Sequence, residues 1–438
     1  MNLRLFLFFL CLTGVVCSQC YWNTECSYKY FSSKTLYNSV RGDIRDSIIK
    51  IKQCEPISMW SIIRHGQRNP GIDFARQMKK ALSLKKLIVK SFDRKNSSVC
   101  AQDIENLRNW NVPMDMLTNV RYLTKQGYQE SLGIGQRIRA VFPDLVNNLD
   151  EGTYQFQSAY GHWLVNSMKA FVEGITAGNN DKIIEEINDD GDIIAPYSIC
   201  GKYQEEVKKN PQTYAEAEKY KGHPDFIKTK DSIQKRTGIN YKLFNDNITT
   251  LYDLCRYTWS GTEKYSPWCS IFSQEDLEVL EYIGDLRHYY RSSYGIPMNI
   301  KFAGPILWDL LKKFEEAKQG NGKKIVSYSA HETMTDMVLT ALGLFKDDLP
   351  LTGKEKKPDR KLRTSIISCF STNIMAVLNR CTQDKLSNYN VIFYLNEEPL
   401  TALCEGGICS WDQFEDLLKP FINATVDPEF CQFKTNRY

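Results

Sequence analysis

The chain has 438 residues, of which 42% are hydrophobic and 25% are charged, and its formal net charge is +4 at pH 7. A chain of this length can bury a substantial core and is expected to form one large domain or two. Its small net charge argues against a nucleic-acid binder and against a polybasic membrane binder, so any preference for anions must come from local geometry.

The first 18 residues have the form of a secretory signal peptide. Arg4 supplies the positive charge, Leu5 to Leu12 is an apolar run too short to span a bilayer, and Val15 to Ser18 offers small residues for cleavage. No later stretch reaches spanning length. We therefore expect a protein of the secretory-pathway lumen or of the outside of the cell, without a membrane anchor.

Cysteine usage agrees with export. Cys11 and Cys17 belong to the predicted signal peptide, which leaves 12 of the 14 cysteines, an even number compatible with six disulfides. No Cys-x-x-Cys pair has zinc-like partners and the five histidines are scattered, so we expect neither a metal site nor a cofactor. Three Asn-x-Ser/Thr sequons, at Asn96, Asn247 and Asn423, also suit the secretory route.

The stretch from Ile57 to Pro70 carries the strongest chemical signal. Its first half is mostly apolar and β-branched, which predicts a buried strand, and a helix is expected to follow Pro70. Between the two lie Arg64, His65 and Arg68. Two guanidiniums beside one imidazole at the carboxyl end of a strand suit a dianionic tetrahedral group, since Arg presents forked donors to phosphate oxygens. The imidazole is then left to act as a nucleophile or as an acid and base.

Residues 64–70 follow the pattern Arg-His-Gly-x-Arg-x-Pro, which is expected by chance in only about 10⁻⁴ of chains this long. The pattern resembles that of the histidine acid phosphatases, a branch of the histidine phosphatase superfamily. Further elements in matching order extend the resemblance to nearly the whole mature chain, and most closely to the multiple inositol polyphosphate phosphatases. These elements are a Leu-Thr-x-x-Gly turn at Leu123 to Gly127, the segment from Pro267 to Gly295 and the tail from Asn396 to Cys409.

The pattern of strands and helices, together with the resemblance, predicts an α/β fold with a Rossmann-like central sheet flanked by helices and an inserted, mainly helical domain. Further strands are expected at Tyr154 to Ser158, Lys324 to Ser329, Asn373 to Asn379 and Asn390 to Leu395. From about residue 179 the sequence becomes charged, aromatic and rich in Asn, with little β-branched alternation. We therefore expect a phosphatase core at 19–178 and 299–438, and a helical cap at 179–298.

His331 and Glu332 follow one of these predicted strands, where they can meet the first motif across the sheet. The resemblance implies that His331, Arg64 and Arg68 bind the phosphoryl group and that His65 is the nucleophile. Glu332 would protonate the leaving alkoxide and then deprotonate the water that hydrolyses the phosphohistidine. A His-Glu pair alone is weak evidence for a catalytic role. It gains weight here because the Arg-His-Gly-x-Arg-x-Pro motif already predicts a phosphate site.

Two positions depart from the family. His-Glu stands where the family usually has His-Asp, or His-Ala-Glu in the inositol phosphatases. Aligning Ser167 and Phe171 with the family's pattern places Trp163 where a third pocket arginine is usual, and no nearby residue is expected to replace that guanidinium. Losing one charge-assisted contact to a phosphoryl group costs about 2–4 kcal/mol of transition-state stabilisation, so this position predicts a weakened or an inactive enzyme.

The sequence thus favours a secreted, metal-independent phosphomonoesterase that acts on inositol polyphosphates or on smaller phosphates such as bisphosphoglycerate. The expected partner is a small phosphorylated substrate and not a nucleic acid. The alternative, which Trp163 favours, is a catalytically impaired pseudophosphatase that acts as a secreted binding protein. A phosphoglycerate mutase conflicts with the signal peptide and with the Arg-x-Pro extension of the motif.

Overall fold

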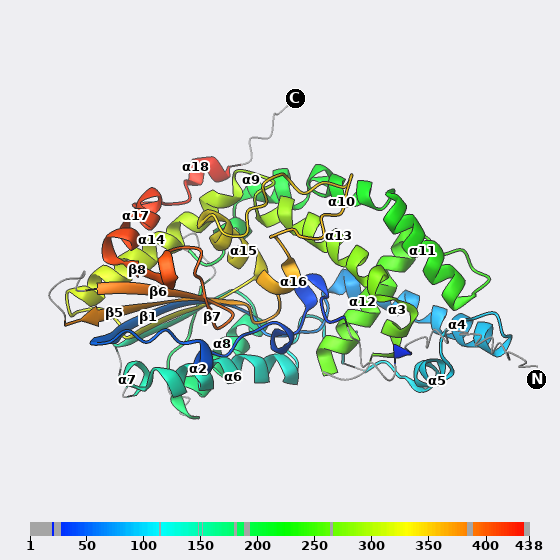
Figure 1. The fold of residues 1–438 in the computed structure, drawn as a ribbon, viewed down its shortest axis with the longest axis horizontal. Coiled ribbons are helices and arrows are strands. Elements are labelled where there is room, and N and C mark those ends of the chain that lie inside the picture. Colours follow the sequence, from blue (N-terminus) through cyan, green and yellow to red (C-terminus); the bar gives the residue numbers. More distant parts are fainter. Residues whose placement is uncertain are drawn as a thin grey trace, which may run out of the picture.

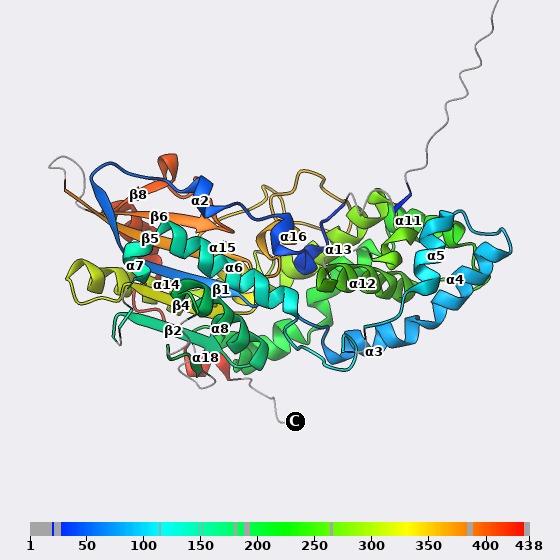
Figure 2. The same cartoon turned by 90° about the horizontal axis from the view of Figure 1, so that it is seen from below.

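The structure, a computed structural model, describes residues 20–21, 28–113, 115–147, 149–150, 152–178, 182–187, 193–262, 266–382 and 389–432. The predicted signal peptide lies outside these ranges. The molecule is elongated, with a helix-covered sheet at one end and a helical part at the other (Figure 1). The same two parts lie side by side when the molecule is seen from below (Figure 2).

One mixed sheet organises the first part, with strand order β3-β2-β4-β1-β5-β6-β7 and β8 paired to β6. Strands β3, β2, β4 and β1 are parallel neighbours, and β5 and β6 continue the sheet with antiparallel pairing. Every predicted strand is present, with bounds within three residues of those expected. The bounds are β1 Cys54–Arg64, β2 Tyr154–Ala159, β3 Glu185–Ile187, β4 Ile325–Ala330, β5 Asn373–Cys381, β6 Tyr389–Leu395, β7 Glu398–Pro399 and β8 Ile408–Ser410.

Helices cover both faces of the sheet, which is why β4 is buried along its whole length. Alternate residues of β1 point to opposite faces: Met59 belongs to the apolar cluster that contains residues of α6 and α8, and Trp60 belongs to the one that contains residues of α14 and α17. In Figure 1, α6, α7 and α8 lie below the sheet, and α14, α15 and α17 lie above it. The bounds are α6 Lys125–Val141, α7 Pro143–Val146, α8 His162–Thr176, α14 Asn299–Lys318, α15 Glu332–Ala341 and α17 Trp411–Leu418.

The helical part is built from two stretches of chain, one between β1 and α6 and one after β3 (Figures 1 and 2). The expected helix after Pro70 is α3, and a capping box of Ser273 and Asp276 begins α13. None of the helices that the structure describes has the length and apolar character needed to cross a membrane. The bounds are α3 Ile72–Ala81, α4 Ser83–Asp93, α5 Ala101–Asn109, α9 Gly201–Tyr203, α10 Ala215–Tyr220, α11 Pro224–Thr237, α12 Asn245–Thr262 and α13 Gln274–Ser292.

The predicted fold class, an α/β core sheet with an added helical part, is confirmed. The domain boundaries remain a prediction. Helices α3 to α5 fall within the sequence range expected for the core, and they lie beside α11 and α12 in the helical part (Figure 2). The short helices that complete the described chain are α2 Ile44–Ser47, α16 Thr364–Ile367 and α18 Pro428–Cys431.

Five disulfides form among the described residues, so the expectation of six needs a correction. Cys369 is buried without a disulfide, and its Sγ lies 3.0 Å from Thr372 Oγ1. Cys26 lies outside the described residues. The pairs are Cys20–Cys100, Cys54–Cys381, Cys200–Cys431, Cys255–Cys269 and Cys404–Cys409.

Candidate active site

The two predicted motifs meet at the carboxyl ends of neighbouring parallel strands. Arg64 of β1 lies opposite Ala330 of β4, so the next residues, His65 and His331, leave the sheet together. Their imidazole ring centres are 5.9 Å apart and the rings are nearly perpendicular. The sheet therefore brings all five predicted site residues to one edge, as expected of ligand sites in parallel α/β sheets.

His65 is buried and its ring orientation is fixed. Nδ1 lies 2.9 Å from the Gly66 carbonyl oxygen, which can only accept, so Nδ1 carries the proton and Nε2 keeps its lone pair. Burial, together with the charges of Arg68 and Arg64 and the neighbouring His331, lowers the pKa of His65 well below its usual value. The imidazole is therefore neutral, with one unprotonated nitrogen available for attack.

The Leu-Thr-x-x-Gly turn holds the loop that carries His65. Thr124 caps α6 by accepting from the Gly127 N–H, and it also donates to the Gln67 carbonyl at 3.1 Å. Gly66 and Gly127 cross backbone to backbone, and a Cβ on Gly66 would overlap the Gly127 carbonyl oxygen. Ser167 on α8 accepts from the Gly66 N–H at 3.0 Å. The Leu-Thr-x-x-Gly turn, which is only a weak sequence signal by itself, thus fixes the position of the loop that carries His65.

Arg64 is fully buried, and other groups of the protein accept hydrogen bonds from both of its terminal nitrogens. Nη1 donates to the Ser33 and Ser368 carbonyls at 2.7 and 2.6 Å, and Nη2 pairs with the Glu332 carboxylate. The guanidinium also lies 4.6 Å from the centre of the Phe370 ring. Its Nε has no hydrogen-bond partner among the described residues.

His331 is the residue before α15, at the positive end of that helix. Burial, and next the charge of Arg68, lower the pKa of His331 to about 3. The ring is therefore neutral at physiological pH, and it can offer one N–H to a phosphoryl oxygen.

Glu332 begins α15 and lies in a cluster of basic groups. Its Oε1 is 3.0 Å from Arg291 Nη2 and 3.8 Å from His288 Nε2, and its Oε2 pairs with Arg64 and, at 3.4 Å, with Lys34. Burial alone would raise the pKa of Glu332, but this positive charge outweighs it and holds the pKa well below its usual value. Glu332 is therefore a carboxylate in the unliganded protein.

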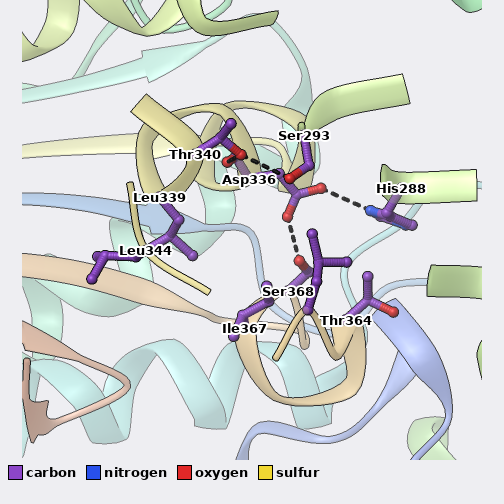
Figure 3. A pocket seen from close by; sticks show the side chains of 10 residues that line it. His288, Ser293, Asp336, Leu339, Thr340, Leu344, Thr364, Ile367 and Ser368 are labelled. Atoms are coloured by element: carbon purple, nitrogen blue, oxygen red, sulfur yellow. Dashed lines mark hydrogen bonds and ion pairs between the residues drawn. The ribbon is translucent and has the colours of Figure 1, made fainter. Parts of the chain in front are cut away.

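A hydrogen-bonded network behind Glu332 fixes the His288 ring. Asp336, one turn along α15 from Glu332, lies 2.7 Å from His288 Nδ1 and also accepts from Ser368 (Figure 3). Ser292 donates to the same carboxylate at 2.7 Å. His288 Nδ1 thereby points to Asp336, and Nε2 is left toward Glu332. The cavity at this network is only about 10 Å³, so it is too small for a substrate.

A cleft of about 540 Å³ is strongly basic, and of the site residues described above it is lined by Lys34, Arg68, His288, Arg291 and Glu332. Of its three acidic side chains, Asp253 is paired with Arg256 and Glu332 with the cluster described above. Seven Lys and Arg side chains line it: Lys34, Arg68, Arg121, Lys221, Arg256, Arg287 and Arg291. The excess of positive charge makes the cleft suitable for a ligand with several negative charges.

Trp163 faces this site. Its ring centre is 6.0 Å from that of His331, and its ring lies 5.7 Å from the guanidinium carbon of Arg68. Arg121 lies at the same 5.7 Å from the indole ring. The expectation that no nearby residue would bring a guanidinium to this position was therefore wrong. Leu123 of the Leu-Thr-x-x-Gly turn forms a β-bridge with Arg68, and this contact between loops, which the sequence does not record, brings Arg121 to the site.

Metal ligands are not grouped in this cleft among the described residues. One group of potential ligands does lie together outside the cleft, namely Cys20, Cys100 and Asp103. Its two cysteines are bonded to each other, so they are not available as thiolate ligands.

Comparisons with known proteins agree with this arrangement. The sequence model of the histidine phosphatase superfamily (branch 2) matches residues 57–396. The chain is 28% identical over 418 residues to multiple inositol polyphosphate phosphatase 1 of Drosophila melanogaster, covering 92% of this chain and 88% of that protein. It is 24% identical over 440 residues to the Homo sapiens protein of the same name, with coverage of 92% and 88%.

Solved structures share the fold. The phytase from D. castellii superposes with a TM-score of 0.74 at 17% identity, covering 92% of this chain and 87% of that chain. Bifidobacterium longum multiple inositol polyphosphate phosphatase in complex with inositol hexasulfate gives a TM-score of 0.68 at 15% identity, with coverage of 89% and 97%. The match to the family model and the strand-end histidines together define a phosphatase-type α/β protein.

The chain belongs to branch 2 of the histidine phosphatase superfamily. The resemblance inferred from the sequence is confirmed, and so is the enzyme class, a hydrolase of the histidine acid phosphatase type.

Proposed function

We propose that the chain hydrolyses phosphomonoesters of inositol polyphosphates, or of related small phosphates, through a phosphohistidine on His65. The observation that carries this proposal is the free Nε2 lone pair of a neutral, buried imidazole beside a basic cleft. The named relatives, multiple inositol polyphosphate phosphatases among them, point to the same substrate class.

In the first step, His65 Nε2 attacks phosphorus and the ester oxygen leaves with the bonding electron pair. Arg68, the Nε–H of Arg64 and the N–H of His331 stabilise the negative charge on the phosphoryl oxygens. In the second step, water attacks the phosphohistidine, which releases inorganic phosphate and restores the neutral imidazole.

Glu332 is the proposed proton donor to the leaving oxygen, although its carboxylate form is favoured without ligand. A bound dianionic phosphoryl group places negative charge beside Glu332 and competes for the positive charge of Arg64, Lys34 and Arg291. Both effects raise the pKa of Glu332, so the substrate itself favours the protonated acid. After the leaving group departs, the carboxylate accepts the proton of the attacking water.

The cleft supports a substrate with several phosphates. Besides Arg68, Arg121 and the cluster around Glu332, it offers Lys221, Arg256 and Arg287 from the helical part. A monophosphate needs only the groups beside His65, whereas phosphates on the other carbons of an inositol ring would meet these more distant charges.

Secretion is part of the proposal. The signal-like N-terminus, the five disulfides and the sequons support it, and Asn96 and Asn423 are exposed. Expression in a secretory host, followed by detection of the chain with N-linked glycans in the medium, tests this part. A chain that stays in the cytosol with reduced cysteines would contradict it.

A secreted binding protein without turnover is the second candidate, and the ion-paired carboxylate of Glu332 favours it. The deciding experiment measures phosphate release from inositol hexakisphosphate and from an aryl phosphate at acidic and neutral pH, with EDTA present and absent. We expect release that survives chelation and that His65→Ala abolishes. Tight binding of inositol hexasulfate without any phosphate release would establish the binding protein instead.

A further inference from the structure

Arg68 and Arg121 place two guanidiniums against one indole beside the reactive histidines. Each guanidinium carbon lies 5.7 Å from the centre of the Trp163 ring, and the ring itself lies 6.0 Å from that of His331. Both arginines line the basic cleft. Burial lowers the pKa of Arg68, and the like charges of Arg64 and Arg121 lower it further.

The positive charge of this cluster is opposed by no directly paired carboxylate in the part of the chain that the structure describes, although the charge of Glu332 acts on Arg68. Among the described residues, neither Arg68 nor Arg121 forms an ion pair with a carboxylate. The Trp163 Nε1 and Arg68 Nε groups are buried and have no hydrogen-bond acceptor among the residues in the described ranges. Buried donors without acceptors are costly and rare in folded proteins, and here they are adjacent. The cluster therefore has the charge and the free donors of an anion site.

The backbone holds Arg121 at this place at a conformational cost. Its φ is +64°, in the left-handed region that side-chain-bearing residues rarely adopt. The Arg121 N–H donates to the Pro70 carbonyl at 3.1 Å, and the Asn69 N–H donates to the Tyr122 carbonyl at 2.8 Å. Leu123 then pairs with Arg68 in a β-bridge. The loop before α6 is thus joined to the catalytic loop at Arg121 and at the two residues that follow it, as expected where strain serves a site.

We propose that Arg121 and the indole N–H of Trp163 bind the phosphoryl group that His65 attacks, together with Arg68. Trp163 Nε1 donates to one phosphoryl oxygen and Arg121 supplies the charge that an indole cannot. This assignment rests on the phosphatase function proposed above. It makes Trp163 a working part of the pocket, so the absence of an arginine at position 163 does not imply an inactive enzyme.

Arg121→Asn is the main test, because asparagine tolerates a left-handed backbone while removing the guanidinium. We expect kcat/KM for an aryl phosphate to fall about 10- to 100-fold, the range for losing one charge-assisted hydrogen bond. Inhibition by inorganic phosphate should weaken by a similar factor. Trp163→Phe keeps an aromatic side chain but removes the indole N–H together with one of the two fused rings, and it should lower kcat/KM about 3- to 10-fold. The melting temperature of this variant shows whether the smaller ring also lowers stability.

Arg139→Asn, on the exposed side of α6 away from the cleft, is the control and should behave as wild type. Calorimetric binding of inositol hexasulfate to each full-length variant gives a readout that does not need turnover. If wild type shows no phosphatase activity, weaker binding by Arg121→Asn still supports this assignment while the catalytic proposal fails. If Arg121→Asn unfolds, Arg121→Gly, which suits the same φ, takes its place. Binding and turnover within twofold of the Arg139→Asn control would overturn the assignment.

Discussion

Glu332 must change its protonation state during the proposed reaction, and its surroundings oppose that change in the empty protein. Glu332→Gln keeps the shape but removes both the acid and the negative charge. Hydrolysis of alkyl phosphates should therefore slow much more than hydrolysis of aryl phosphates, whose leaving groups need little protonation. Steady-state kinetics on the two substrate types checks this, and an equal loss on both would mean that Glu332 only positions other groups.

The same substitution should also strengthen anion binding. Arg64, Lys34 and Arg291 would keep their charge without the carboxylate, so the inhibition constant of inorganic phosphate should fall. The unfolding free energy should drop by about 3 kcal/mol at neutral pH, because a buried ion pair would lose one partner. Chemical denaturation measures this loss.

The buried histidines predict how stability depends on pH. His331 titrates near pH 3 when folded and near pH 6.5 when unfolded, so between these values the unfolded chain binds one more proton. The contribution of His331 to the unfolding free energy is therefore fully present above pH 6.5. It is lost as the pH falls toward 3, by up to about 1.4 kcal/mol per pH unit. His65, whose pKa is also lowered, acts in the same direction.

Urea unfolding of the wild-type protein from neutral to acidic pH should show this loss of stability. In His331→Asn the unfolding free energy should fall less steeply as the pH is lowered. Bound inorganic phosphate should reduce the loss in the wild-type protein, because an anion beside the imidazoles favours their charged form. The same pH dependence of the unfolding free energy in the wild-type protein and in His331→Asn would contradict a lowered pKa of His331.

At the scale of elements, the crossing of the His65 loop and the start of α6 is the least tolerant point of the site. Gly66→Ala places a Cβ against the Gly127 backbone, where no side chain can move aside. We expect a loss of at least about 3 kcal/mol in unfolding free energy together with most of the activity. Gly71→Ala, whose Cβ would make only ordinary contact at 3.8 Å, is the control for stability. A Gly66→Ala protein as stable as that control would refute this account of the crossing.

The sequence was sufficient to predict which elements carry the site. An apolar strand followed by a charged motif, and a second buried strand followed by His331 and Glu332, require the two motifs to meet at one sheet edge. The sequence was not sufficient for contacts that cross elements. Arg121 reaches Trp163 through a β-bridge between two loops, and Lys34 and Arg291 reach Glu332 from positions 298 and 41 residues earlier in the chain. No local periodicity records such contacts.

For the whole molecule, the small net charge does not reflect the strong positive charge of the cleft. The chain carries +4, yet its cleft gathers seven basic side chains. The Michaelis constant for inositol hexakisphosphate should therefore rise steeply between about 0.05 and 0.5 M salt, because exposed charges in the cleft are screened over this range. The constant for an aryl phosphate should rise less, since it uses only the buried groups beside His65. Parallel salt dependences would contradict a polyphosphate-binding cleft.

The central claim is that His65 becomes phosphorylated during turnover. Its most direct test is rapid mixing of the full-length protein with substrate, quenching without acid to preserve the phosphorus–nitrogen bond, and mass spectrometry of the peptides. We expect phosphate on His65 in the wild-type protein, and neither phosphopeptide nor turnover in a folded His65→Ala protein. Phosphate on another residue, or turnover by His65→Ala within about tenfold of wild type, would contradict the account.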